Sequence, residues 1–139
     1  MSTATKTDLK AMMKEYFRRA YDENDPSVID EMIAPNMVSH GLTPEPTRTR
    51  EEFKAWYKPF RASFSDVTCK VEHAMVEGEW VCCRLRFSGK HTGEQLGPKP
   101  TGKRINLTAL IMARFVDGQA VEAFQEFNHL ALMQQIGAI

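Results

Sequence analysis

The spacing of apolar residues changes once along the chain, from a helical period in the first half to a strand period in the second. In the first half, apolar residues recur every three to four positions, which is typical of helices with one buried face. We expect a first helix capped by Asp8, with the apolar stripe Leu9, Met12, Met13, Tyr16, Phe17, Ala20 and Tyr21. A short second helix is expected to begin at its cap, Ser27, and to end before Pro35.

A third helix, expected to begin at Thr49 or Arg50, has an unusually aromatic face. Helical spacing places these residues on one side of it: Phe53, Trp56, Tyr57, Phe60 and Phe64. Between the second and third helices, Met37–His40 is expected as a short strand or extended turn, and residues 41–49 as a loop. An aromatic face of this size has to cover a large apolar surface.

From Val67 onward the period shortens to about two residues, as in β-strands. We expect strands at residues 67–76, 80–88, 104–115 and 120–127, a hairpin turn at Asp117-Gly118, and a short last helix that stops at Gly137. Helices followed by such a meander predict an α+β fold, in which a strongly curved antiparallel sheet packs on three helices. This cone-shaped arrangement is expected to form one domain over residues 1–139, with an apolar pocket at its open end.

Composition narrows the partners that we expect. The 18 basic and 18 acidic residues cancel, so no net charge favours nucleic acid or an anionic membrane. The cysteines, Cys69, Cys82 and Cys83, are odd in number and lack metal-ligand spacing, so we expect them to stay reduced. No apolar run approaches the roughly 18 residues of a membrane span, and no signal-peptide pattern opens the chain, which favours the cytoplasm.

The most specific motifs lie in the last third of the chain. The segment that begins at Gly89 reads GKHTGEQLGPKPTGKR, the hairpin reads FVDG, and the end of the chain reads VEAFQEFNHLALMQQIG. Together they resemble the SnoaL-like polyketide cyclases, or ester cyclases, of the nuclear transport factor 2-like superfamily. The resemblance implies a homodimeric α+β barrel that binds a hydrophobic small molecule and needs no metal or organic cofactor. It also implies ring closure by an intramolecular aldol reaction, in which an aspartate near the end of the last strand removes a proton from carbon.

Asn128 stands at the position of that aspartate, so the chain lacks the family's catalytic base at this position. An amide cannot take up a proton, but it can donate a hydrogen bond to a carbonyl or enolate oxygen; alternatively, Asn128 caps the last helix. Strand alternation places Glu126 on the same face as Asn128. Glu126 is a candidate base if it faces the apolar cavity, and otherwise a solvated carboxylate on a dimer rim or outer face.

Two histidines match pocket positions of the family, His40 near the short strand and His91 in the GKHTG segment. Either could shuttle a proton or hold a substrate carbonyl, although single histidines are more often structural. The expected pocket lining comprises Tyr16, Phe17, Trp56, Phe60, Arg84, Met112, Glu122 and Phe124. For Arg84 and Glu122 a structural role is an open alternative. No metal site is expected, because the histidines and cysteines lack ligand spacing.

Three functions are open at the level of sequence. The first is an enzyme that rearranges a hydrophobic, oxygen-rich small molecule by acid/base chemistry without a cofactor. In it, the candidate base is Glu126, the polar anchor is Asn128, and the two histidines hold carbonyls or carry protons. The second is a non-catalytic ligand-binding protein on the same fold, and the third is a hydroxylase or hydrolase variant that uses water in the pocket.

A homodimer is expected from the strand at residues 104–115, which has apolar residues on both faces. Ile105, Leu107, Ala109, Ile111 and Ala113 share one face, while Leu110 and Met112 interrupt the polarity of the other. A second copy that covers this other face would hide it from water.

Overall fold

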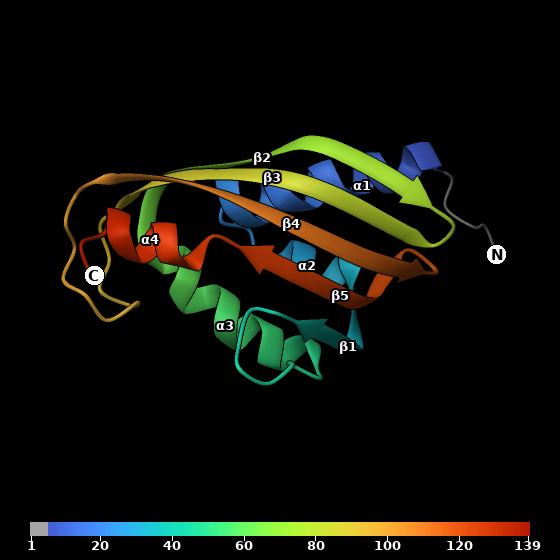
Figure 1. Ribbon diagram of the computed structural model, residues 1–139. Coiled ribbons are helices and arrows are strands. Elements are labelled where there is room, and N and C mark those ends of the chain that lie inside the picture. The colour runs from blue at the N-terminus through green and yellow to red at the C-terminus, as the bar shows by residue number, and fades with distance from the viewer. Residues whose placement is uncertain (1–5) are drawn as a thin grey trace.

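The computed structural model describes residues 6–139 and contains one curved sheet with helices on one of its faces (Figure 1). The helices are α1 (Lys6–Phe17), which continues into the π-helical turn η1 (Arg18–Asp22), α2 (Ser27–Met32), α3 (Arg50–Ala62) and α4 (His129–Gln135). The strands are β1 (Ile33–His40), β2 (Phe64–Glu77), β3 (Trp80–His91), β4 (Arg104–Val116) and β5 (Gln119–Phe127). The expected α+β class is confirmed.

The sheet has the order β1-β5-β4-β3-β2, and strands β2 to β5 are antiparallel neighbours, as predicted. The expected antiparallel sheet has one parallel edge, where β1 pairs with β5. β1 is also longer than the expected strand at Met37–His40, because it already begins at Ile33. Pro35 lies within it, exposed, on an edge strand where a missing N–H need not break a ladder bond.

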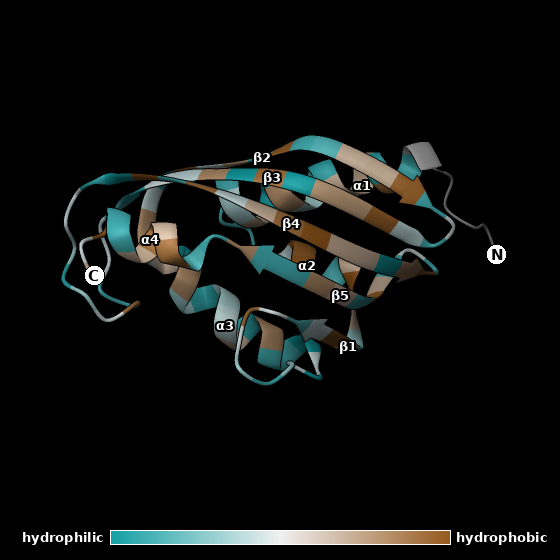
Figure 2. Cartoon of the chain, in the orientation of Figure 1, coloured by the Kyte–Doolittle hydropathy of each residue, from teal (hydrophilic) through white to brown (hydrophobic). Residues whose placement is uncertain are grey.

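Alternation along the strands gives the sheet an inner face, toward the helices, and an outer face. On β4 the inner residues Ile105, Leu107 and Ile111 are buried, whereas the outer residues Leu110 and Met112 are exposed. Figure 2 shows the resulting bands of hydrophobic and hydrophilic residues along the strands. Because α1 packs on β2, and α3 on β1 and β2, the helices enclose the inner face.

α3 begins where the sequence predicts, because the Thr49 side chain accepts a hydrogen bond from the Glu52 backbone N–H at 3.1 Å. The residues of α3 that are buried against the sheet are Phe53, Tyr57 and Phe60. Trp56 is half-buried, and Phe64 begins β2 instead of extending the helix. Most of the aromatic face therefore packs in the core, and only Trp56 is partly exposed.

Two of the expected helix caps are wrong. Asp8 lies inside α1, which already includes Lys6. Ser27 is the first residue of α2, and its hydroxyl donates to the Asp25 carboxylate at 2.6 Å instead of capping the helix. The apolar faces are unaffected, since Leu9 and Val28 are both buried.

At the end of β1 the chain passes very close to β5. Gly41 has a φ of +101°, and a Cβ there would lie 1.9 Å from the backbone oxygen of Gln125, so only glycine fits without a shift. Ser39 and Thr47 then exchange two backbone hydrogen bonds, of 2.9 and 3.0 Å, which close the loop between them. This loop carries Leu42 to the site described next.

Candidate active site

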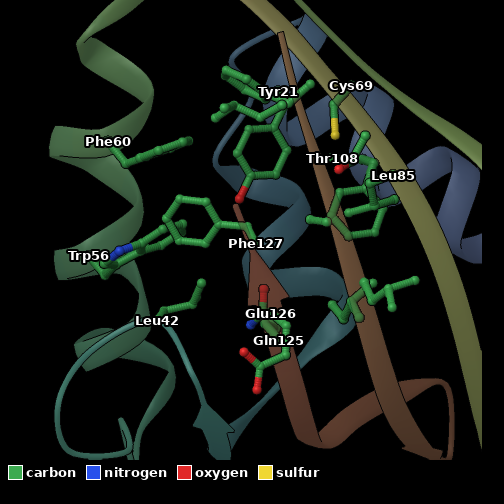
Figure 3. A pocket seen from close by; sticks show the side chains of 16 residues that line it. Tyr21, Leu42, Trp56, Phe60, Cys69, Leu85, Thr108, Gln125, Glu126 and Phe127 are labelled. Atoms are coloured by element: carbon green, nitrogen blue, oxygen red, sulfur yellow. The ribbon is translucent and has the colours of Figure 1, made fainter. Parts of the chain in front are cut away.

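A cavity of about 60 Å³, here called the outer chamber, lies between the inner face of the sheet, η1 and α3 (Figure 3). Its wall is mainly aromatic: Trp56 stacks on Phe60 with ring centroids 5.0 Å apart, and Phe60 contacts Phe127 at 6.2 Å. Leu42 borders it from the loop after β1. Of the residues expected to line a pocket, Phe17, Trp56 and Phe60 do so here.

Tyr21 directs its hydroxyl into the outer chamber (Figure 3). Its backbone carbonyl, in η1, accepts a hydrogen bond from Nε of the buried Arg61 at 2.7 Å, which fixes the turn. Burial holds the pKa of Tyr21 well above its ordinary value, so the phenol stays protonated and is a hydrogen-bond donor. Within residues 6–139 this hydroxyl has no hydrogen-bond partner, which leaves it free for a ligand.

Gln125 is the second polar side chain on the cavity wall. It lies on β5, and its Nε2 donates to the hydroxyl of the buried Ser39 on β1 at 2.8 Å. The bond joins the two parallel strands beside the cavity and fixes the direction of the amide. A fixed amide beside an unpaired phenol can orient one carbonyl or hydroxyl group of a ligand.

The sequence did not identify Tyr21 or Gln125 as polar groups of the site. Tyr21 was expected only as part of an apolar helix stripe. On β5, the register shifts opposite Arg114 and Phe115, so Ala120 and Ala123, three positions apart, are both buried. Beyond this bulge Gln125 falls on the inner face. In the sequence, the apolar residues Ala123 and Phe127 lie two positions before and after Gln125, and this alternation could have indicated that Gln125 faces inward.

Glu126 lies between Gln125 and Phe127 and is exposed. It borders the outer chamber at its mouth and also a shallow groove on the outer face, which Arg84 and Asn128 share. Glu126 is therefore at the entrance of the cavity and not enclosed within it. Strand alternation puts Glu126 on the outer face, opposite Leu110, and it also borders the cavity from its mouth.

Asn128 caps α4. Its Oδ1 accepts a hydrogen bond from the Ala131 backbone N–H at 3.0 Å. The cap uses the amide oxygen, so the NH₂ group is the part of Asn128 that can reach a ligand in the neighbouring groove.

Several expected pocket residues lie on the outer face instead. His40 pairs with Glu122, with 3.1 Å between Nε2 and Oε2, and its ring stacks on Phe124 at 4.4 Å. Met112 lies next to Phe124 across β4 and β5, and Arg84 shares the carboxylate of Glu72 with Arg86. The expected site residues that border neither the outer chamber nor the second cavity described below are His40, His91, Asn128, Arg84, Met112, Glu122 and Phe124.

His91 is fully buried at the end of β3. Its backbone N–H donates to Lys103 at 2.9 Å, its carbonyl accepts from Gly102 at 2.8 Å, and its Nδ1 accepts from the Thr101 backbone N–H at 3.3 Å. Nε2 has no hydrogen-bond partner among the described residues. These bonds close the loop at residues 92–102, which is a structural role.

A second cavity of about 30 Å³, the inner chamber, lies deeper under the sheet. Tyr16, expected as a pocket residue, borders this chamber, and burial raises the pKa of its phenol. In the outer chamber, burial likewise raises the pKa of the Cys69 thiol, so a neutral thiol and not a nucleophilic thiolate faces the cavity.

Residues 6–139 contain no group of three or more His, Cys, Asp or Glu side chains arranged to hold a metal ion. In the same range, none of the helices has the length and apolar character required to cross a bilayer.

A helix-covered curved sheet around an apolar cavity places this protein among the α+β barrels of nuclear transport factor 2-like fold. Residues 11–136 match the family described as SnoaL-like polyketide cyclase, and the chain belongs to this family. The resemblance inferred from the motifs is thereby confirmed.

Individual relatives are distant. The chain is 26% identical over 130 residues to the aklanonic acid methyl ester cyclase DauD of Streptomyces sp. (strain C5), which covers 93% of this chain and 79% of that protein. The solved structure of TsrD from Streptomyces laurentii is 26% identical, with a TM-score of 0.86, and covers 99% of this chain and 100% of that one. AclR of Streptomyces galilaeus, a candidate hydroxylase, is 25% identical, with a TM-score of 0.86 and coverage of 97% and 84%.

Proposed function

We propose that the protein is a cofactor-independent cyclase, which binds a hydrophobic, oxygenated small molecule in the outer chamber and closes a ring by acid/base chemistry. The observation that carries the proposal is the composition of that chamber. Its walls are aromatic, Tyr21 and Gln125 offer hydrogen bonds inside it, and Glu126 is the carboxylate at its mouth. Membership in a family with curated ester cyclases supports the same reaction class.

In this mechanism Glu126 removes a proton from a carbon next to a substrate carbonyl. The enolate oxygen accepts a hydrogen bond from the Tyr21 hydroxyl, which can donate because it stays protonated. The enolate carbon then attacks a second carbonyl of the same molecule, forming a carbon–carbon bond. The resulting alkoxide takes back the proton from the Glu126 carboxylic acid, so the product is an isomer of the substrate.

The outer chamber sets a limit on how much substrate it encloses. A cavity of about 60 Å³ holds a fragment of the size of a few water molecules. A substrate with several rings has to extend out of the chamber, past Leu42 and Trp56, which border it. Its reacting end then lies next to Glu126, and the NH₂ group of Asn128 lies near the part that stays outside.

The test uses aklanonic acid methyl ester, the compound in the name of the relative DauD, and follows ring closure by chromatography. Glu126→Gln should abolish most turnover and leave binding nearly unchanged, because the amide keeps its hydrogen bonds but cannot carry the proton. Glu94→Gln, at an exposed carboxylate that borders neither chamber, is the control and should behave as wild type. Wild-type turnover by Glu126→Gln would refute the assigned base.

A non-catalytic binding protein is the second candidate, because Asn128 stands at the family's aspartate position and caps α4. Asn128→Asp separates the two functions. In a binding protein the new carboxylate can create slow cyclase activity. In the proposed enzyme it should weaken substrate binding instead, because it removes the NH₂ donor beside the part of the substrate that stays outside the chamber. The similarity to AclR keeps a hydroxylase that uses water in the same cavity as a third candidate.

We also propose a homodimer that buries the outer face of the sheet. One row of side chains crosses all five strands in register: His40, Phe124, Met112, Cys82 and Met75. Met75 is 69% exposed, and Met112 and Phe124 are each 40% exposed. A continuous apolar row of this kind is hidden from water when two copies pack face to face.

A cytoplasmic location is proposed from the cysteines. Cys69, Cys82 and Cys83 are all free. Free thiols are typical of a reducing compartment.

A further inference from the structure

The inner and outer chambers adjoin. Both are bordered by Phe17, Tyr21, Ile111 and Gln125, so these four residues form the partition between them. The outer chamber has the mouth at Glu126, while the inner chamber lies behind the partition, beneath α1, β1 and the inner face of β4 and β5. A ligand that enters at the mouth therefore meets Tyr21 and Gln125 before it reaches the inner chamber.

The inner chamber exists because small residues of the sheet face flexible residues of the opposite wall. Ala113 and Ala123 are cross-strand partners on β4 and β5, and both are buried. On the helix side the chamber is bordered by methionines, Met13 of α1 and Met32 of α2. The chamber is lined mainly by apolar side chains, and apolar cavities in proteins stay dry and take up apolar guests.

The volume limits what can enter. About 30 Å³ of accessible space is enough for roughly two groups of the size of a water molecule or a methyl group. The polar groups at the partition, the unpaired Tyr21 hydroxyl and the Gln125 amide, suit an oxygen atom and not a second apolar group.

We infer that the two chambers form one binding site, in which the substrate inserts a short alkyl group of about two or three carbons into the inner chamber. The alkyl group is attached to a carbon that bears a carbonyl or hydroxyl oxygen, and this oxygen is held at the partition by Tyr21 and Gln125. The inference rests on the proposed function and names the class of its substrate: an oxygenated aromatic or polyketone compound with a short alkyl end. Ala123 sets the length of that end.

The test is a homologous series of 2,4-dihydroxyphenyl alkyl ketones, with acyl chains from acetyl to hexanoyl, measured by calorimetry. With wild-type protein, affinity should rise by about fourfold per methylene for the first two or three and then level off or fall, because each buried methylene adds apolar burial until the chamber is full. Ala123→Leu fills the inner chamber and should abolish the dependence on chain length, with little loss for the acetyl compound.

Ala109→Leu is the matched control, because Ala109 borders the outer chamber but not the inner one. It should weaken all members of the series by a similar factor and keep the dependence on chain length. An unchanged dependence in Ala123→Leu, or equal flattening in both variants, would overturn the inference.

A second measurement, which uses none of these ligands, tests the inner chamber even if Ala123→Leu fails to fold. A crystal of the wild-type protein pressurised with xenon should show xenon between Ala123 and Met37, and the milder Ala123→Val should lower its occupancy. Failure to find xenon there contradicts an accessible inner chamber. If affinity depends on chain length but Glu126→Gln cyclises at the wild-type rate, the assigned base is wrong and the two-chamber site stands. If Glu126→Gln loses ring closure but affinity does not depend on chain length, the base is supported and the two-chamber site is wrong.

Discussion

At the scale of single residues, the Gln125 amide connects the sheet edge to the cavity. Gln125→Leu should destabilise the fold by about 1–3 kcal/mol, because it leaves the buried Ser39 hydroxyl without its donor. Urea unfolding of the single and double variants with Ser39→Ala checks the physical cause. If the hydrogen bond matters, the double variant costs less than the sum of the two single ones; full additivity would contradict the coupling.

The buried tyrosine phenols and cysteine thiols predict how the free energy of unfolding depends on pH. Burial raises the pKa of Tyr16 and Tyr21 above the ordinary 10.0, and that of Cys83 from 9.0 to about 12. The unfolded chain therefore loses these protons before the folded protein does, so stability is complete below about pH 9 and falls as the pH rises above it. Unfolding by urea at about pH 8 and about pH 10.5 measures the difference.

Cys83→Ala provides the control for this pH dependence. The variant loses some core packing at every pH. Its stability should nevertheless fall less steeply between the two pH values, because one of the groups with a raised pKa is gone. A wild-type protein as stable at the higher pH as at the lower one would show that these groups ionise without unfolding.

At the scale of secondary structure, the contact at Gly41 holds the loop after β1 against β5. Gly41→Ala places a Cβ within 1.9 Å of the Gln125 backbone oxygen, so β1 or β5 has to move. Gly97→Ala is a matched control, because Gly97 has a similar φ of +104° but nothing within 4 Å of its missing Cβ. Both variants carry backbone strain of roughly 1–3 kcal/mol, and only Gly41→Ala adds the clash.

The measurement for these glycine variants is thermal unfolding combined with amide hydrogen exchange of β1 and β5. Gly41→Ala should lose more stability than Gly97→Ala and should lose protection at the β1–β5 pairing. Equal losses of stability in the two variants would mean that the close approach of Gly41 to Gln125 does not contribute to stability.

Elements with strong local signals were predictable from sequence. The alternation and turn residues of β2 to β5 gave these strands to within a few residues, and Thr49 gave the start of α3. β1 was only partly predictable, since its parallel partner is far away in sequence and Pro35 interrupts the pattern. The bulge in β5 was not predictable from alternation, and it decides that Gln125, and not Glu126, faces inward.

At the scale of the whole molecule, the exposed apolar row predicts the oligomeric state. Met112→Glu, in the middle of the outer face, should convert a dimer to a monomer, because a carboxylate would be buried in an apolar interface. Leu130→Glu is the control: Leu130 is 59% exposed but lies on α4, away from the row, and should leave the dimer intact. Analytical ultracentrifugation at micromolar concentration reads out both variants. A monomeric wild-type protein would exclude this interface.

Proton removal by Glu126 at the mouth of the outer chamber is tested most directly by hydrogen exchange at carbon, which does not require ring closure to occur. An aryl alkyl ketone, which has no second carbonyl and so cannot close a ring, is incubated with the protein in D₂O, and loss of the C–H signal next to its carbonyl is followed by NMR. Wild-type protein should accelerate the exchange well above the buffer rate, and Glu126→Gln should return it to that rate while still binding the ketone. Equal acceleration by both proteins would contradict the role of Glu126 as the base.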